Sequence, residues 1–373
     1  MVTATRPRNR RQLIVEAAGQ VFSERGYHAA SMEEIAAAEG ISAAALYRHF
    51  PNKQALFAEC ANVFADRLVE ALPDAGDLTE VLTALTRVTV ARRASAGLYR
   101  WEARHLEEAA RQRLRVKFGH VVGRVVETSG GERLRAIAAL GAIGSITMHR
   151  TSIAQHRIEE LLVASAAGVV ATDPAVAAGT AGRVELPAQP VPRTRRAEIL
   201  AAAVPLFARD GFANVTNGQI AQVVGLAPSA IYRHYPSKVE ILVAACLRAA
   251  GLLSQAVDRS LHRASDPRAA VLALAAAYVA YSFEHNALTS VAEAELRGLP
   301  ADRRRPLIVA QRAHIGVWEQ RLRAVRPELD PRSARLLVHA GFGVVVEAGR
   351  ALRWRDTPGH RDAVTALVTG AMI

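Results

Sequence analysis

The chain has 373 residues, of which 50% are hydrophobic, and its formal net charge at pH 7 is +12. This length is sufficient for two or three domains with large cores, and the charge is compatible with a polyanionic partner. An uninterrupted apolar stretch of about 20 residues is absent, and residues 1–11 lack the apolar centre of a signal peptide. We therefore expect a cytoplasmic protein without a membrane partner.

The sequence contains none of the common catalytic patterns. Gly-x-Ser-x-Gly, a Walker loop, His-Glu-x-x-His and Cys-x-x-Cys are all absent. The two cysteines, Cys60 and Cys246, fall on expected helices and are predicted to be buried small hydrophobic residues without a disulfide. We predict that the protein is not an enzyme and has neither a cofactor nor a metal site.

The first segment with a clear pattern predicts a helix that ends at Gly26, since apolar residues from Ile14 to Phe22 recur at helical spacing. Ser31 and Glu34 form the sequence pattern of a capping box, which predicts the start of a second helix.

Gly40 is expected to end the second helix, and Ser42 to cap a short third helix over residues 43–50. Pro51 stops that helix, and Asn52 is expected to cap a long fourth one. Two short helices joined by a tight turn with Gly predict a helix-turn-helix (HTH), whose second helix enters the DNA major groove.

The same pattern returns 185 residues later without a gap. The matched pairs are Phe22 and Phe207, Gly26 and Gly211, Ser31 and Thr216, Ile35 and Ile220, Gly40 and Gly225, Tyr47 and Tyr232, Arg48 and Arg233, His49 and His234, and Lys53 and Lys238. In the second copy Gln219 replaces the capping glutamate, Pro228 lies near the start of the third helix, and Ser237 caps the fourth. A fixed long period indicates an internal duplication.

The repeated run, ending in Tyr-Arg-His-Phe/Tyr-Pro-x-Lys, resembles the DNA-binding domain of the TetR family of transcriptional regulators over residues 10–60 and 195–245. The resemblance implies an all-α fold of two TetR-like repeats, each an HTH domain followed by a helical ligand-binding and dimerisation core. The expected segments are HTH domain 1 (1–53), core 1 (54–172), a Pro/Gly-rich linker (173–193), HTH domain 2 (194–238) and core 2 (239–373). Helices in core 1 are expected at 54–71, 78–95, 97–127, 132–150 and 153–171.

The resemblance assigns the DNA-facing residues. They are Ser31, Ser42, Ala43, Ala44, Tyr47, Arg48, His49 and Lys53 in domain 1, and Thr216, Ala227, Pro228, Ser229, Tyr232, Arg233, His234 and Lys238 in domain 2. Few of these side chains suit base edges, so part of the specificity is expected from DNA shape. The chain has only three lysines among its 47 basic residues, and two of them are the matched Lys53 and Lys238. They are predicted to contact phosphates. The alternative explanation for their matched positions is common descent of the two halves.

Arginines precede both HTH domains, at positions 6, 8, 10 and 11 and at positions 193, 195 and 196. Such arms can enter a minor groove, although a solvated tail is an equally good interpretation of the first.

The cores are expected to bind a small hydrophobic effector. The candidate ligand residues are Trp101, Glu102, His105, Tyr278, Tyr281 and Trp318, with Phe342 and His314 as further candidates. Aromatic residues at helical spacing also suit a plain core.

Because both halves share one chain, we expect them to pair with each other as a pseudo-dimer on an asymmetric DNA operator, acting as a repressor that the effector releases. A regulator with one vestigial HTH domain and a helical ligand-binding protein without DNA binding are the alternatives.

The third helices of the two HTH domains should choose different half-sites, because their first residues differ. Replacing residues 43–45 (Ala-Ala-Ala) with the Pro-Ser-Ala of residues 228–230 should change the preferred half-site without abolishing binding. Each lost base preference should cost about 1–3 kcal/mol. Selection from random DNA measures this; the same asymmetric site for wild type and variant would contradict it.

Overall fold

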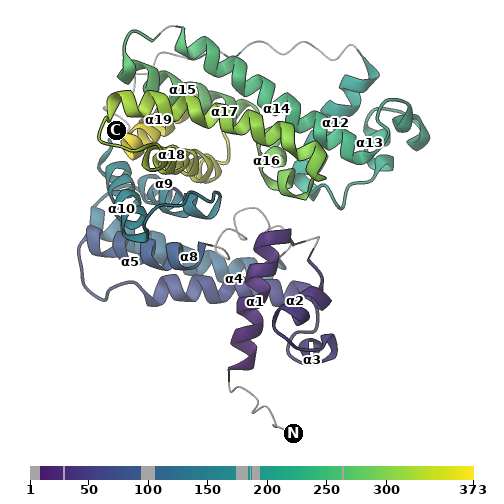
Figure 1. The fold of residues 1–373 in the computed structure, drawn as a ribbon, viewed down its shortest axis with the longest axis horizontal. Coiled ribbons are helices and arrows are strands. Elements are labelled where there is room, and N and C mark those ends of the chain that lie inside the picture. The colour runs from purple at the N-terminus through teal and green to yellow at the C-terminus, as the bar shows by residue number, and fades with distance from the viewer. Residues whose placement is uncertain are drawn as a thin grey trace. The chain divides into compact units, whose positions relative to one another are not determined.

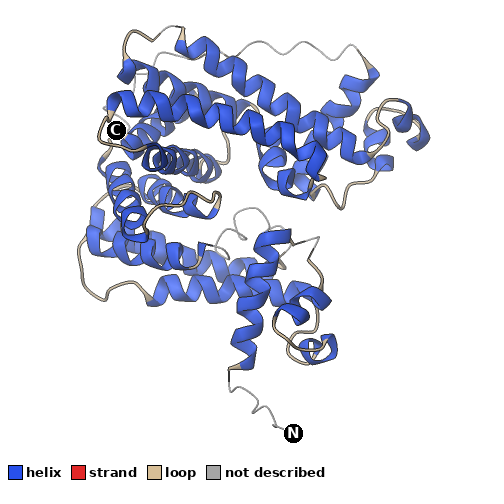
Figure 2. Cartoon of the chain, in the orientation of Figure 1, coloured by secondary structure: helices blue, strands red, loops and turns tan. Residues whose placement is uncertain are grey.

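The computed structural model describes residues 9–27, 30–93, 106–173, 184, 186, 194–262 and 264–373. Over these residues the chain forms helices, turns and loops without a strand (Figure 2), which confirms the all-α prediction. The chain divides into two compact units, Met1–Val170 and Ala171–Ile373, each of which is described by itself. Apart from its first residue and residues 184 and 186, the predicted linker lies outside the described residues.

In the first unit the HTH helices precede an antiparallel helical core (Figure 1). The helices are α1 (Arg10–Arg25), α2 (Met32–Ala38), α3 (Ala43–Tyr47), α4 (Lys53–Glu70), α5 (Leu78–Ala91), α8 (Glu108–Ser129), α9 (Arg133–Gly144), the 3₁₀ helix η2 (Ser145–Thr147) and α10 (Gln155–Ala171). Helix α4 packs against both α1 and α8. It therefore belongs to both the HTH domain and the core.

The second unit repeats this order. Its helices are α12 (Arg195–Asp210), α13 (Asn217–Val223), the 3₁₀ helix η3 (Pro228–Arg233), α14 (Lys238–Leu261), α15 (Pro267–Glu284), α16 (Asn286–Glu295), the 3₁₀ helix η4 (Leu296–Gly298), α17 (Ala301–Val325), α18 (Pro331–Ala351) and α19 (Pro358–Met372). Helix α14 packs against α12, α15, α16 and α17, so it links HTH domain 2 to the core as α4 does in the first unit.

Several predicted helices differ from the observed ones at their ends. The helix expected over 97–127 begins only at Glu108, because Glu107 has an extended backbone (ψ 153°); residues 97–105 lie outside the described part. The helix expected over 132–150 changes to 3₁₀ geometry at Ser145 and ends at Thr147. The third helix of HTH domain 1 ends at Tyr47 instead of 50.

The third element of HTH domain 2 is a 3₁₀ helix. Its bonds from Ala230 N to Ala227 O (2.9 Å) and from His234 N to Ile231 O (3.0 Å) have equivalents in domain 1, where Leu46 N also makes an α-helical i to i+4 bond to Ser42 O (3.1 Å). The two recognition elements therefore differ in backbone geometry as well as in sequence.

Helix α14 is long and apolar enough, by length and composition, to cross a membrane. Part of its apolar surface faces the core of the unit, since Ile241, Leu242 and Cys246 are buried in the core that α12 and α16 complete, while Leu247 on the same helix is 51% exposed. Both cysteines are buried, as predicted, and burial raises the pKa of the Cys246 thiol to about 12.

The α18–α19 junction depends on a glycine. After α18 the chain turns back through Arg353 and Trp354, which both have left-handed φ values (53° and 52°). Trp354 N donates to Gly349 O (2.8 Å), and the indole lies where a Cβ on Gly349 would be, 2.3 Å from the nearest ring carbon. The same indole packs edge-on against Phe283 at the end of α15 (5.4 Å between centroids).

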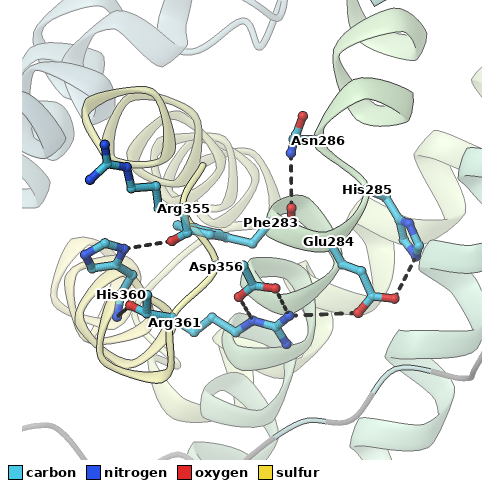
Figure 3. A network of polar contacts seen from close by, with 9 residues as sticks. Phe283, Glu284, His285, Asn286, Arg355, Asp356, His360 and Arg361 are labelled. Atoms are coloured by element: carbon cyan, nitrogen blue, oxygen red, sulfur yellow. Dashed lines mark hydrogen bonds and ion pairs between the residues drawn. The ribbon is translucent and has the colours of Figure 1, made fainter. Parts of the chain in front are cut away.

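Polar contacts join the same elements beside this packing (Figure 3). Arg361 at the start of α19 bonds to Asp356 and reaches Glu284 of α15 at 3.9 Å. The ring of His360 bonds to the carbonyl of Arg355 (2.7 Å). The junction therefore ties the ends of α15, α18 and α19 together.

Adding a methyl group at Gly349 should destabilise the second unit. Gly349→Ala should lower the free energy of unfolding by about 1–3 kcal/mol, because the Cβ would overlap the Trp354 ring. Gly316→Ala on α17, where no atom lies within 4 Å of the added Cβ, should raise it by up to about 1 kcal/mol. Urea unfolding measures both. Adding Trp354→Ala to Gly349→Ala should remove part of the penalty, and strict additivity of the two would contradict the overlap.

Candidate nucleic-acid interface

The tyrosine–arginine pair of each recognition element lies on the surface. Tyr47 and Tyr232 are 47% and 58% exposed, and the arginines that follow them, Arg48 and Arg233, are exposed as well. Behind them Leu46 is fully buried, as Ile231 is in the second copy; both were predicted to be core. The two domains therefore present the same aromatic and cationic groups at the same register.

The N-terminal caps position the second and third helices. Ser31 Oγ accepts from Glu34 N (3.1 Å) and the Glu34 carboxylate accepts from Ser31 N (3.1 Å). Thr216 and Gln219 make the equivalent reciprocal pair at 3.2 and 2.7 Å. Both predicted capping boxes are confirmed.

The recognition element of domain 1 begins with a cap as well, since Ser42 Oγ accepts from Ala45 N at 3.2 Å. The exposed residues at this start include Ser42 and Ala44, while Ala43 is half-buried; Ala227, Pro228 and Ser229 are all exposed in domain 2. Their contact with DNA stays a prediction.

A matched arginine holds the far end of each recognition element. Arg11 Nη1 donates to His49 O (3.2 Å), and its guanidinium lies 4.4 Å from the Phe50 ring centroid. In domain 2, Arg196 donates to His234 O and lies 3.9 Å from the centroid of Tyr235. The Tyr235 hydroxyl donates to Arg196 O (3.1 Å).

These arginines are therefore partners of the recognition element within the domain, which corrects their assignment to free arms. The neighbouring Arg10 and Arg195 also lie in the first helical turn, paired with Glu39 (2.9 Å) and Glu198 (2.7 Å). The arginines at 6, 8 and 193 lie outside the described residues.

The matched lysines, at the start of α4 and α14, bind the loop between the first two helices of each HTH domain. Lys53 Nζ donates to Ala30 O (2.9 Å) and lies 4.7 Å from the Tyr27 ring centroid. Lys238 Nζ donates to the carbonyls of Phe212 (2.6 Å), Ala213 (3.2 Å) and Val215 (2.7 Å), 4.5 Å from the Phe212 centroid. The phosphate contact predicted for these lysines stays a prediction, and it would compete with these bonds.

Burial lowers the pKa of the Lys238 ammonium, while the nearby Glu295 carboxylate opposes that shift. A lysine ammonium that donates three hydrogen bonds to backbone carbonyls has no donor left over for a bound anion. The sequence indicated the position through its register but not these partners.

The predicted ligand residues separate into three groups. Trp101, Glu102 and His105 lie outside the described residues. Tyr281 is buried, and its hydroxyl donates to Ala249 O (3.2 Å). Tyr278 and Trp318 belong to a buried cluster.

We call this group of Tyr278, His314, Trp318 and Phe342 the aromatic cluster. Ring centroids are 4.4 Å apart for Tyr278 and Phe342, and 5.4 Å apart for Trp318 and Phe342. His314 stacks on Phe342 at 5.8 Å, and burial lowers the pKa of its imidazole to about 4, so it is neutral at pH 7. His314 Nε2 and Trp318 Nε1 are buried without a hydrogen-bond partner.

In the first unit a hollow of about 530 Å³ lies between the starts of α4 and α8. Its lining includes Pro51, Asn52, Glu59, Glu107, Arg113 and Leu114. Over the part of the chain that the structure describes, no group of three His, Cys, Asp or Glu is placed to hold a metal ion.

Comparison with protein families finds the model described as "Bacterial regulatory proteins, tetR family" twice, at residues 14–60 and 199–245. The two matches lie in the 185-residue register of the repeat. They cover most of each HTH domain and the first turns of α4 and α14.

Curated relatives match over short stretches. The chain is similar to the HTH-type transcriptional activator FasR of Mycolicibacterium smegmatis, 43% identical over 70 residues (19% of this chain, 32% of the relative). It is 38% identical over 77 residues to the HTH-type transcriptional repressor AcnR of Corynebacterium glutamicum (21% of this chain, 40% of the relative). The chain thus spans less than half the length of these two relatives.

Among solved structures, a TetR-family transcriptional regulator from Bordetella parapertussis 12822 is 21% identical, with a TM-score of 0.44. The similarity covers 48% of this chain and 95% of that one.

The stacked arginine should not be replaceable by lysine. Arg196→Lys should lower the free energy of unfolding of the second unit by about 1 kcal/mol, because a lysine cannot place a planar group over Tyr235 and also reach His234 O. Arg195→Lys, which changes an exposed i,i+3 pair, should stay within about 0.5 kcal/mol of wild type. Chemical unfolding measures both, and equal effects would contradict the role of stacking.

Proposed function

We propose that this chain, whose two HTH domains both match the model of the tetR family, is a cytoplasmic DNA-binding transcriptional regulator. The observation that carries the proposal is the duplicated HTH domain with its exposed Tyr-Arg pair, Tyr47-Arg48 and Tyr232-Arg233, at one register. An exposed cation beside an exposed tyrosine at the end of a recognition element suits the phosphate backbone.

The proposal extends to a single-chain pseudo-dimer on an asymmetric operator. Two covalently joined HTH domains bring two recognition elements to DNA together. Those elements are unequal, since one is α-helical (Ala43–Tyr47) and the other is a 3₁₀ helix (Pro228–Arg233). Because paired HTH domains read half-sites that mirror their own symmetry, unequal elements favour an operator without a true palindrome.

The effector belongs to the second core in this proposal. The aromatic cluster carries an unpaired N–H on Trp318 and an unpaired nitrogen at His314 Nε2. Buried polar atoms without partners are costly, so a ligand that supplies a hydrogen bond to either would recover free energy. A flat, largely apolar molecule with one polar group fits this chemistry and would act by releasing DNA.

A salt titration of DNA binding tests the regulator and separates it from a ligand-binding protein without DNA binding. The full chain should bind the DNA upstream of its own gene, and binding should weaken steeply as salt rises. Footprinting should show two unlike half-sites. No binding at low salt would contradict the proposal, and protection of one half-site only would favour a vestigial HTH domain.

The exposed arginines should carry part of the affinity. Arg48→Ala and Arg233→Ala should each weaken binding and reduce the log–log salt slope by about 0.9 if the side chain contacts a phosphate. If it reads guanine, the loss should be about 1–3 kcal/mol at one base pair only. Arg312→Ala on α17, an exposed arginine outside the HTH domain, is the control. Binding unchanged in both domain variants would exclude these arginines from the interface.

A further inference from the structure

Phe212, two residues after the last residue of α12, is bound from two sides by other helices. Its N–H donates to the carboxylate of Glu295 (Oε1, 3.3 Å), and its carbonyl accepts from Lys238 Nζ (2.6 Å). Its ring contacts the same ammonium at 4.5 Å and packs edge-on against Phe207 at 5.3 Å. Both polar backbone groups and the ring of one residue thus depend on two charged side chains.

These two side chains come from helices outside the α12–α13 pair. Lys238 is the first residue of α14, and Glu295 is the last residue of α16. Helix α16 packs against both α12 and α14. The α12–α13 loop is therefore bonded to the core of the second unit, and to a helix that follows it by more than seventy residues.

The loop sets the position of the first helix of the HTH pair. Lys238 also binds the carbonyls of Ala213 and Val215, and Val215 directly precedes Thr216, the N-cap of α13. With Val215 fully buried, little freedom remains between Phe212 and the start of α13. A shift of this loop would shift α13 and the turn that carries η3.

We propose that Glu295 and Lys238 are positioning residues for HTH domain 2: together they hold the Phe212–Val215 loop, so that α16 of the core sets the placement of α13 and η3. Opposite charges on the two sides of one peptide group strengthen both hydrogen bonds relative to neutral partners. In this role Lys238 acts within the protein and does not contact phosphate. The proposal rests on the proposed DNA binding for one of its two readouts.

The first readout is hydrogen–deuterium exchange without DNA, followed in the peptide that spans residues 208–218. Glu295→Ala should speed exchange there by roughly 10-fold or more, because a charge-assisted acceptor is lost. Glu295→Gln keeps a carbonyl oxygen at the same place but loses the charge, so its exchange rate should lie between those of wild type and Glu295→Ala. Glu198→Ala, which removes an exposed carboxylate from α12, is the matched control and should leave the loop unchanged.

The second readout is the affinity for DNA across a salt series. Glu295→Ala and Lys238→Met should each raise the dissociation constant roughly tenfold with an unchanged log–log salt slope, because neither variant removes a phosphate contact. In the double variant the losses should not add, since both side chains act on the same loop. Circular dichroism and the melting temperature identify any variant that fails to fold, in which case Glu295→Gln and Lys238→Arg are compared instead.

Three results would overturn the proposal. Wild-type exchange in Glu295→Ala would show that the carboxylate does not hold the loop. A slope lowered by about one in Lys238→Met would make the ammonium a phosphate contact. Faster exchange with unchanged DNA affinity would remove the positioning role. If the wild-type chain binds no DNA, the proposed function fails, while the exchange experiment still decides whether the loop is bound in this way.

Discussion

Each HTH domain is organised by two cation–aromatic contacts, one on each side of the recognition element. Arg11 and Arg196 lie over the rings of Phe50 and Tyr235, just after the recognition element. Lys53 and Lys238 lie over the rings of Tyr27 and Phe212, in the loop between the first two helices of the domain. In all four cases the cation also donates to a backbone carbonyl. Short helices of five to seven residues are marginal alone, so these contacts help to fix their positions in the domain.

The long helix after each HTH domain carries the lysine of these contacts at its first position. Lys53 and Lys238 are the first residues of α4 and α14, directly after the caps Asn52 and Ser237. A side chain at the start of a helix is directed back past its N-terminus, and here it reaches the loop between the first two helices of the domain. The same helices continue into the cores, so the HTH domain and the core share one rigid element instead of a hinge.

Local signals were readable from the sequence, while long-range partners were not. Residues only a few positions apart determine the capping boxes at Ser31 and Thr216 and the helix end at Gly26. The sequence pattern therefore predicted these features. Arg11 and Phe50 have 38 residues between them in the sequence, and Phe212 and Glu295 are even farther apart. Only the folded structure shows that these residues are in contact. The 185-residue repeat does contain one signal for the arginine–aromatic contact, since an arginine and an aromatic residue recur together at 11 and 50 and at 196 and 235.

The bonds from Glu295 and Lys238 to Phe212 also bear on what counts as a module in this chain. The family similarity ends at residue 245, within α14 and well before α16. A fragment cut at that point would keep the recognition element but lose the acceptor for the Phe212 N–H. The segment that the family model matches is therefore shorter than the segment that supplies the bonds of Phe212, which includes residues from the core.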